Sequence, residues 1–279
     1  MQYICLVLCA LWIPAPPIRN VADPTIVGDI ESHLPAGHPY GDPDLITTVH
    51  EGTHGINSLL RNQYGMPCFY LLNNKAARIK EPLTALNQVA LRVPKSLRGD
   101  VYHLYLVQMQ RYWNRQPSYI LDEYVAYTNG AEARERLGIR MRTETVDYML
   151  EFSVYATVLA MEQNSPELQE LLKYQLDRVL RIYQRAGYIS PYMIRLRGAN
   201  DDEATRFKTF AAAYYGRGGF SSTGRIQSWP LLDCDRVQAS RVHAKGFPQT
   251  QYNKRYRREF RGNCNARNRS KESWQSLGI

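Results

Sequence analysis

The chain of 279 residues lacks the features that define several large classes of protein. It has no run of about 18 uninterrupted apolar residues, which excludes a polytopic membrane protein. Its five cysteines show neither CxxC pairs nor the spacing of a zinc knuckle. Glycine-rich phosphate loops and the G-x-S-x-G motif of serine hydrolases are absent as well. Because 44% of the residues are hydrophobic, the chain can still bury a sizeable core, and we expect a globular protein.

Excess charge is scarce over most of the chain and is concentrated at its end. The formal net charge is +9, and residues 241–279 alone carry ten Lys and Arg against Glu259 and Glu272. The first 240 residues hold 25 basic and 24 acidic groups, so nucleic acid is an unlikely partner for the body of the protein. The basic tail is compatible with binding nucleic acid or an anionic surface, although a solvated extension is the simpler interpretation.

The order of turn and helix signals predicts a mostly α-helical α+β fold with a small β-sheet or hairpin. We expect three segments. Residues 1–20 are an apolar start that is either signal-like or the first strand, residues 21–215 form the catalytic domain, and residues 216–279 form a Gly-rich, then basic tail that is flexible. The apolar start slightly favours a secreted or cell-envelope protein over a cytoplasmic one. Oligomeric state is left open.

Local signals place the individual elements. Asp44 can cap a helix that runs to about Asn62 and ends at Gly65. Asn73 and Asn74 suit the tight turn of a hairpin built from residues 68–79. An extended or looping approach segment is expected from Val21 to Tyr40. Further helices are predicted over residues 83–92, 96–113, 118–137, 143–163, 165–185 and 202–215.

The sequence His50-Glu51-Gly52-Thr53-His54 carries the clearest chemical signal, because it is an H-E-x-x-H motif. Residues i and i+4 lie one turn apart on a helix, so both imidazoles can bind one metal ion. Glu51 lies about 100° around the helix, where it can take a proton from water at the metal without being a ligand. The small residues between the histidines would leave room for a metal and a substrate.

A hydrolytic zinc site needs a third protein ligand and keeps one position open. Glu123 ranks first, since a carboxylate in an otherwise apolar and aromatic helix is costly to bury without a positive partner. Glu151 ranks second and His103 third. Asp122 should point about 100° away from Glu123. A salt bridge from Glu123 to an arginine is the alternative that needs no metal.

These residues resemble the zincin metallopeptidases, and in particular the gluzincins. The resemblance rests on His50-Glu51-Gly52-Thr53-His54 and on Asp122-Glu123 in a later helix. It implies a zincin-like catalytic domain that holds one Zn²⁺ per chain through His50, His54 and Glu123, with Glu51 as general base. The thermolysin-like aspartate four residues after the ligand glutamate is replaced by Tyr127, so the residue that orients a ligand histidine is not identified.

The resemblance further implies a zinc-dependent hydrolase, a metallopeptidase that cleaves peptide bonds in a peptide or protein substrate with zinc-bound water. The alternative is a catalytically silent zincin-like protein that binds a metal or a partner, with the basic tail binding nucleic acid or an anionic surface. Several residues could stabilise an oxyanion, and the sequence does not choose among them: His103, Tyr119, Tyr127, Tyr214 and Tyr215.

Overall fold

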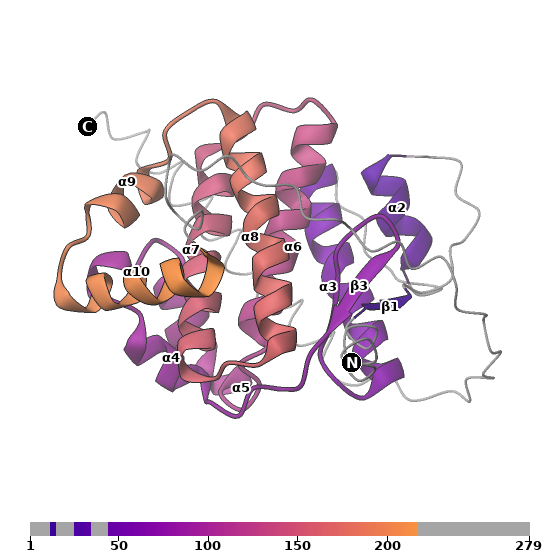
Figure 1. Ribbon diagram of the computed structural model, residues 1–279. Coiled ribbons are helices and arrows are strands. Elements are labelled where there is room, and N and C mark those ends of the chain that lie inside the picture. Colours follow the sequence, from indigo (N-terminus) through magenta and orange to yellow (C-terminus); the bar gives the residue numbers. More distant parts are fainter. Residues whose placement is uncertain (1–11, 15–24, 35–43, 217–279) are drawn as a thin grey trace, which may run out of the picture. The chain divides into compact units, whose positions relative to one another are not determined.

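A computed structural model describes residues 12–14, 25–34 and 44–216 (Figure 1). The described part is mostly α-helical with one small antiparallel sheet, which confirms the predicted mostly α-helical α+β class. The predicted tail at 216–279 lies outside the described residues from residue 217 on, as does most of the apolar start. None of the described helices combines the length and the apolar character needed to cross a lipid bilayer.

The elements follow one another in an order dominated by helices. The strands are β1 (Trp12–Pro14), β2 (Cys68–Tyr70) and β3 (Lys75–Arg78). The helices are α2 (Ile26–His33), α3 (Leu45–Tyr64), α4 (Leu86–Arg92), α5 (Gln110–Trp113), α6 (Tyr119–Arg136), α7 (Thr143–Glu162), α8 (Pro166–Ala186), α9 (Pro191–Gly198) and α10 (Asp202–Tyr215). A short 3-10 helix (Lys95–Leu97) and a π-helical segment (His103–Gln108) lie between α4 and α5.

Helix α3 begins and ends where the local signals predict. The Asp44 side chain accepts a hydrogen bond from the backbone N–H of Ile46 at 3.3 Å. Gly65 ends the helix in the left-handed conformation, with φ of 68°, and its N–H donates to the carbonyl of Arg61. Capping at both ends therefore fixes the bounds of α3, within which the whole H-E-x-x-H motif lies and the helical period places His50 and His54 on one face.

The hairpin after α3 also forms as predicted. Strands β2 and β3 pair antiparallel with Cys68 opposite Arg78, and Asn73 and Asn74 have the positive φ values of the turn. Strand β1 adds to the other side of β3, so the sheet order is β1-β3-β2. The described part of the apolar start is thus a β-strand.

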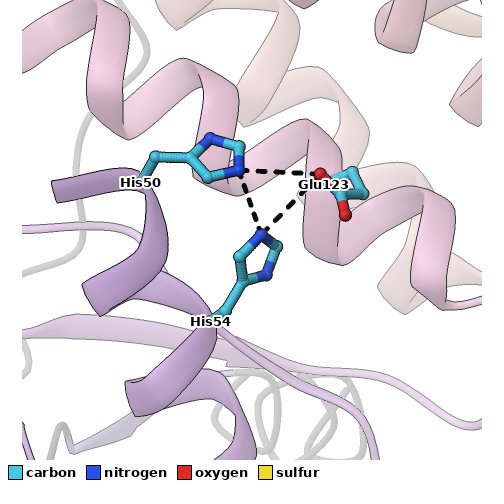
Figure 2. A group of neighbouring side chains, drawn as sticks. All are labelled: His50, His54 and Glu123. Carbon is cyan, nitrogen blue, oxygen red and sulfur yellow. Dashed lines mark hydrogen bonds and ion pairs between the residues drawn. The ribbon is translucent and has the colours of Figure 1, made fainter. Parts of the chain in front are cut away.

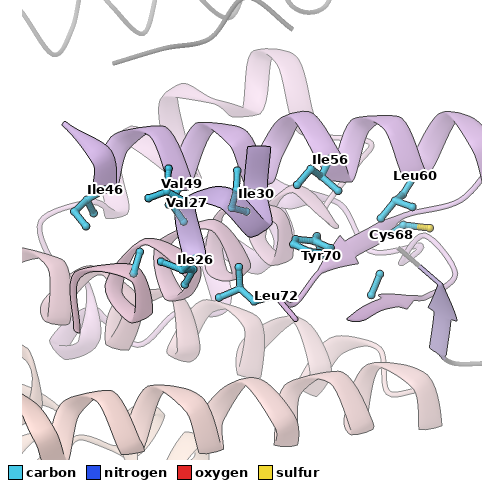
Figure 3. Close-up of a cluster of buried hydrophobic side chains, with 12 residues drawn as sticks. Ile26, Val27, Ile30, Ile46, Val49, Ile56, Leu60, Cys68, Tyr70 and Leu72 are labelled. Carbon is cyan, nitrogen blue, oxygen red and sulfur yellow. The ribbon is translucent and has the colours of Figure 1, made fainter. Parts of the chain in front are cut away.

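The core beside the motif is built from α2, α3 and the hairpin (Figure 3). Val49, Ile56 and Leu60 of α3 are completely buried, and Ile30 of α2 packs into the same cluster. A Cβ atom at Gly52 would lie 2.4 Å from Cγ2 of Ile30. Gly52 therefore permits the close approach of α2, and its small size serves helix packing rather than access to the metal.

Two predictions of local structure are wrong, and one helix was not predicted. Residues 26–33 were expected to be extended or looping, but they form α2, capped by Thr25. The helix expected over 96–113 is broken near Gly99, because the N–H of Val101 donates to the buried Glu151 carboxylate at 3.4 Å. Helix α9 was not predicted; it begins at Pro191, behind the capping hydroxyl of Ser190.

Helix α6 is central to the described fold. It packs against α3 on one side and against α7 and α8 on the other (Figure 1). Asn129 of α6 strengthens the contact with α3, because its amide N–H groups donate to Thr53 Oγ1 at 3.1 Å and to the carbonyl of Tyr70 at 2.9 Å. Arg178 of α8 donates to its amide oxygen at 2.8 Å. These buried bonds hold α3 and α6 at a fixed spacing, on which the candidate site depends.

Candidate metal centre

His50, His54 and Glu123 converge between α3 and α6. The two histidines lie one turn apart on α3 and point toward Glu123 on the neighbouring helix (Figure 2). The side chain of Glu123 is fully buried, and those of His50 and His54 are 13% and 14% exposed. In the part of the chain that the structure describes, this is the group of His, Cys, Asp and Glu side chains that could hold a metal ion.

The spacing of the three ligand atoms suits one small cation. The Nε2 atoms of His50 and His54 lie 3.2 Å apart, and each lies 3.7 Å from Oε2 of Glu123, which is longer than a hydrogen bond. Atoms at these separations lie on a circle with a radius of about 2.1 Å, close to the lengths of Zn–N and Zn–O bonds. Two imidazoles and a carboxylate are also a donor set found in catalytic zinc sites. The residues therefore fit a metal ion.

Asp122 orients His54 from the side opposite the ligand atom. Its Oδ2 lies 2.9 Å from Nδ1 of His54, and its Oδ1 accepts a hydrogen bond of 2.5 Å from the side-chain amide of Asn57. The amide oxygen of Asn57 accepts in turn from the N–H of Tyr70, at 2.6 Å. The hairpin thus fixes Asn57, Asn57 fixes Asp122, and Asp122 selects the Nδ1–H tautomer that leaves Nε2 available for a metal.

The sequence did not identify this network. The helical period predicts only that Asp122 points away from Glu123, and no sequence motif marks Asn57. A signal was present for both, because Asp122 adjoins the expected ligand Glu123 and Asn57 follows His54 by three residues on the same helical face. The position filled by aspartate in thermolysin-like enzymes holds Tyr127 here, and Asp122 makes the contact with a histidine instead.

Burial and the charges around the site shift the pKa values of the two imidazoles in opposite directions. Burial lowers the pKa of His54, but the negative charges of Asp122 and Glu123 outweigh it and raise the pKa well above 6.5. Burial and the neighbouring His54 hold the pKa of His50 well below that value. Burial opposes ionisation of Asp122, yet the charge of His54 and the hydrogen bonds from His54 and Asn57 lower its pKa. These opposite shifts make His54 the more basic of the two imidazoles in the absence of a metal, and any proton on a ligand nitrogen must leave when a cation binds.

The two rival ligands lie elsewhere. Glu151 is buried on α7, where its carboxylate accepts from the N–H of Val101 and from the hydroxyl of Tyr155. His103 is exposed in the π-helical segment. Neither belongs to the group formed by His50, His54 and Glu123.

Glu51, the expected general base, lies on α3 directly after His50 and is partly buried. Two candidate oxyanion donors adjoin the ligands. Burial and the charge of Glu123 raise the pKa of Tyr119 well above 10, and the ring of Tyr127 lies 4.5 Å from that of His50. Tyr215 instead bonds to Thr157 on α7, at 2.8 Å. The site thus brings a group that could hold a metal ion together with two tyrosine side chains, between two packed helices.

Comparison of the chain with protein-family models, with curated proteins and with solved structures gives no match.

Proposed function

We propose that the protein is a zinc-dependent hydrolase, and specifically a metallopeptidase. The observation that carries the proposal is the convergence of His50, His54 and Glu123, with Asp122 behind His54 and Glu51 within the same motif. A structural metal site usually has four protein ligands, whereas three protein ligands and an adjacent carboxylate are typical of a catalytic one.

Each residue has a separate task in this proposal. His50, His54 and Glu123 would hold the zinc ion, which supplies a Lewis acid that polarises a carbonyl group and makes water acidic near neutral pH. A carboxylate oxygen of Glu51 would accept the proton of the attacking water and pass it to the leaving nitrogen. Asp122 would keep the proton of His54 on Nδ1 throughout, because it accepts that hydrogen bond.

Metal analysis tests the ligand set. We expect about one zinc per chain in the purified protein and loss of zinc in His54→Ala and in Glu123→Ala. Glu151→Gln is the matched control, since it alters a buried carboxylate that lies outside the group. Retention of zinc in Glu123→Ala would contradict the proposed ligand, and absence of zinc from the wild type after zinc is supplied would contradict the centre as a whole.

Hydrolysis of an unstructured protein such as casein, and of a mixed peptide library, then tests the reaction. Glu51→Gln should keep its zinc but lose about 10²- to 10⁴-fold in rate, the usual contribution of a general base. A zinc-loaded wild type that cleaves no peptide, or a Glu51→Gln variant as active as the wild type, would contradict the peptidase and leave a metal-binding protein without this activity.

A further inference from the structure

The two histidines of the metal centre are held in different ways. His54 is fixed by a hydrogen bond from its Nδ1 to Asp122. Within the described ranges, the polar contacts of His50 lead only to His54 and Glu123, the other members of the centre. Its ring is instead bordered by an aromatic side chain. Tyr127 lies against it with ring centroids 4.5 Å apart and the planes inclined at 68°.

Tyr127 is itself held firmly. Its hydroxyl lies 2.7 Å from the hydroxyl of Tyr105, which is 1% exposed in the π-helical segment. Its ring stacks on the buried Phe152 of α7, at 5.2 Å and 23°. Tyr148, one turn earlier on α7, meets it edge to face at 5.6 Å. Contacts on three sides leave the Tyr127 ring little freedom, so it can act as a rigid surface.

The backbone of α6 brings this surface to the metal centre. Tyr127 follows Glu123 by four residues, so the two side chains share one face of the helix. Gly130 follows three residues later, and a Cβ built there would lie 3.8 Å from Cβ of His50. One helix therefore supplies both the ligand carboxylate and the surface against which the opposite ligand ring rests.

We infer that Tyr127 is a positioning residue for His50. Its ring, held in place by Tyr105 and Phe152, sets the orientation of the His50 imidazole by packing, whereas Asp122 orients the His54 imidazole by a hydrogen bond. This inference rests on the proposed metal centre and extends it. Among the described residues, no carboxylate bonds to Nδ1 of His50 in the way that Asp122 bonds to Nδ1 of His54. The two zinc-binding nitrogens would therefore differ in basicity, with that of His54 the greater.

Two substitutions at Tyr127 separate the ring from the hydroxyl. Tyr127→Phe keeps the ring beside His50, and we expect its zinc affinity to stay within about threefold of the wild type. Tyr127→Leu removes the aromatic surface, and we expect a loss of about tenfold or more, the usual effect of an outer partner of a metal ligand. Phe152→Leu removes the ring that stacks on Tyr127 and should lower the affinity less than Tyr127→Leu does. Glu151→Gln is the matched control, because it alters a buried carboxylate of α7 outside the group, and it should leave the affinity nearly unchanged.

Zinc affinity is measured by competition with a chromophoric chelator, and the visible spectrum of the cobalt-substituted protein reports the ligand geometry directly. Tyr127→Leu should shift the cobalt bands, whereas Tyr127→Phe and Glu151→Gln should retain them. Wild-type affinity and spectrum in Tyr127→Leu, or equal losses in Glu151→Gln, would overturn the inference while leaving the metal centre intact. A wild type that binds neither metal would overturn both, and a wild type that binds zinc without cleaving peptides would overturn only the proposed activity.

Discussion

Replacing Asp122 by asparagine exchanges one oxygen for an NH₂ group, and the structure shows why the change should be costly. The two carboxylate oxygens accept from different donors, Oδ2 from His54 Nδ1 at 2.9 Å and Oδ1 from the amide of Asn57 at 2.5 Å. Asn57 cannot turn its amide over, because its oxygen already accepts from the N–H of Tyr70. An asparagine at 122 has only one acceptor oxygen, so one of the two donors must face its NH₂ group.

The size of the effect follows from the bond that is lost. A hydrogen bond to a charged group contributes about 1.5–3 kcal/mol, which corresponds to roughly 10- to 150-fold in an equilibrium constant. Mutation of an outer partner of a metal ligand typically costs about 10- to 100-fold in metal affinity. We therefore expect Asp122→Asn to weaken zinc binding by about 10- to 100-fold, measured by equilibrium dialysis against a buffered series of free zinc concentrations.

The same geometry predicts a compensating change. In the double variant Asn57→Asp/Asp122→Asn, the new carboxylate can accept from both Tyr70 N–H and the new amide, whose oxygen is then free to accept from His54. We expect the double variant to bind zinc several-fold more tightly than Asp122→Asn alone, although the negative charge has moved away from His54. Wild-type affinity in Asp122→Asn, or a double variant weaker than both single variants, would refute the proposed hydrogen-bond network.

Other predictions concern stability. Burial raises the pKa of Glu151 from 4.5 to about 7, so this group stabilises the fold fully below about pH 4.5 and the stabilisation is lost as the pH rises through 7. This pKa shift corresponds to about 3 kcal/mol in the free energy of unfolding. Glu151→Gln should therefore flatten the pH dependence of the free energy of unfolding in urea between about pH 4.5 and pH 7. Gly99→Ala would place a Cβ 2.2 Å from the Glu151 carboxylate and should lower the free energy of unfolding by about 1–3 kcal/mol; equal stability would show that the turn can shift. Gly52→Ala should cost a similar amount through its clash with Ile30, again measured by urea unfolding. A chelator should lower the melting temperature of the zinc-loaded wild type, since zinc at 100 times its Kd contributes about 2.7 kcal/mol, and should leave His54→Ala unaffected.

The elements that carry their own local signals could be predicted from the sequence. Helix α3 has a capping aspartate at one end and a glycine at the other, and the hairpin has two asparagines at its turn. These residues act through hydrogen bonds and backbone preferences within a few positions, which a single sequence displays directly. The shared helical face of His50 and His54 follows from the same local geometry.

Elements that depend on distant contacts could not be predicted in this way. Helix α2 has only eight residues and rests on the packing of Ile30 against α3 at Gly52, a contact that composition does not reveal. The break near Gly99 depends on Glu151, fifty residues away from Val101, which takes a backbone N–H that a continuous helix would use. In both cases tertiary contacts override the local preference.

The helical period alone did not predict that Asp122 orients His54. Neighbouring residues on a helix point about 100° apart, so Asp122 and Glu123 are not expected to bind one metal ion side by side. An imidazole, however, presents its two nitrogens in different directions, so the metal and the orienting acceptor must approach it from different sides. The offset that removes Asp122 from the group of ligand atoms is what allows it to reach Nδ1 of His54 while Glu123 faces Nε2. Adjacent acidic residues on a helix opposite an H-E-x-x-H motif can therefore divide these two tasks, and a search for the orienting residue should include the position beside the ligand glutamate.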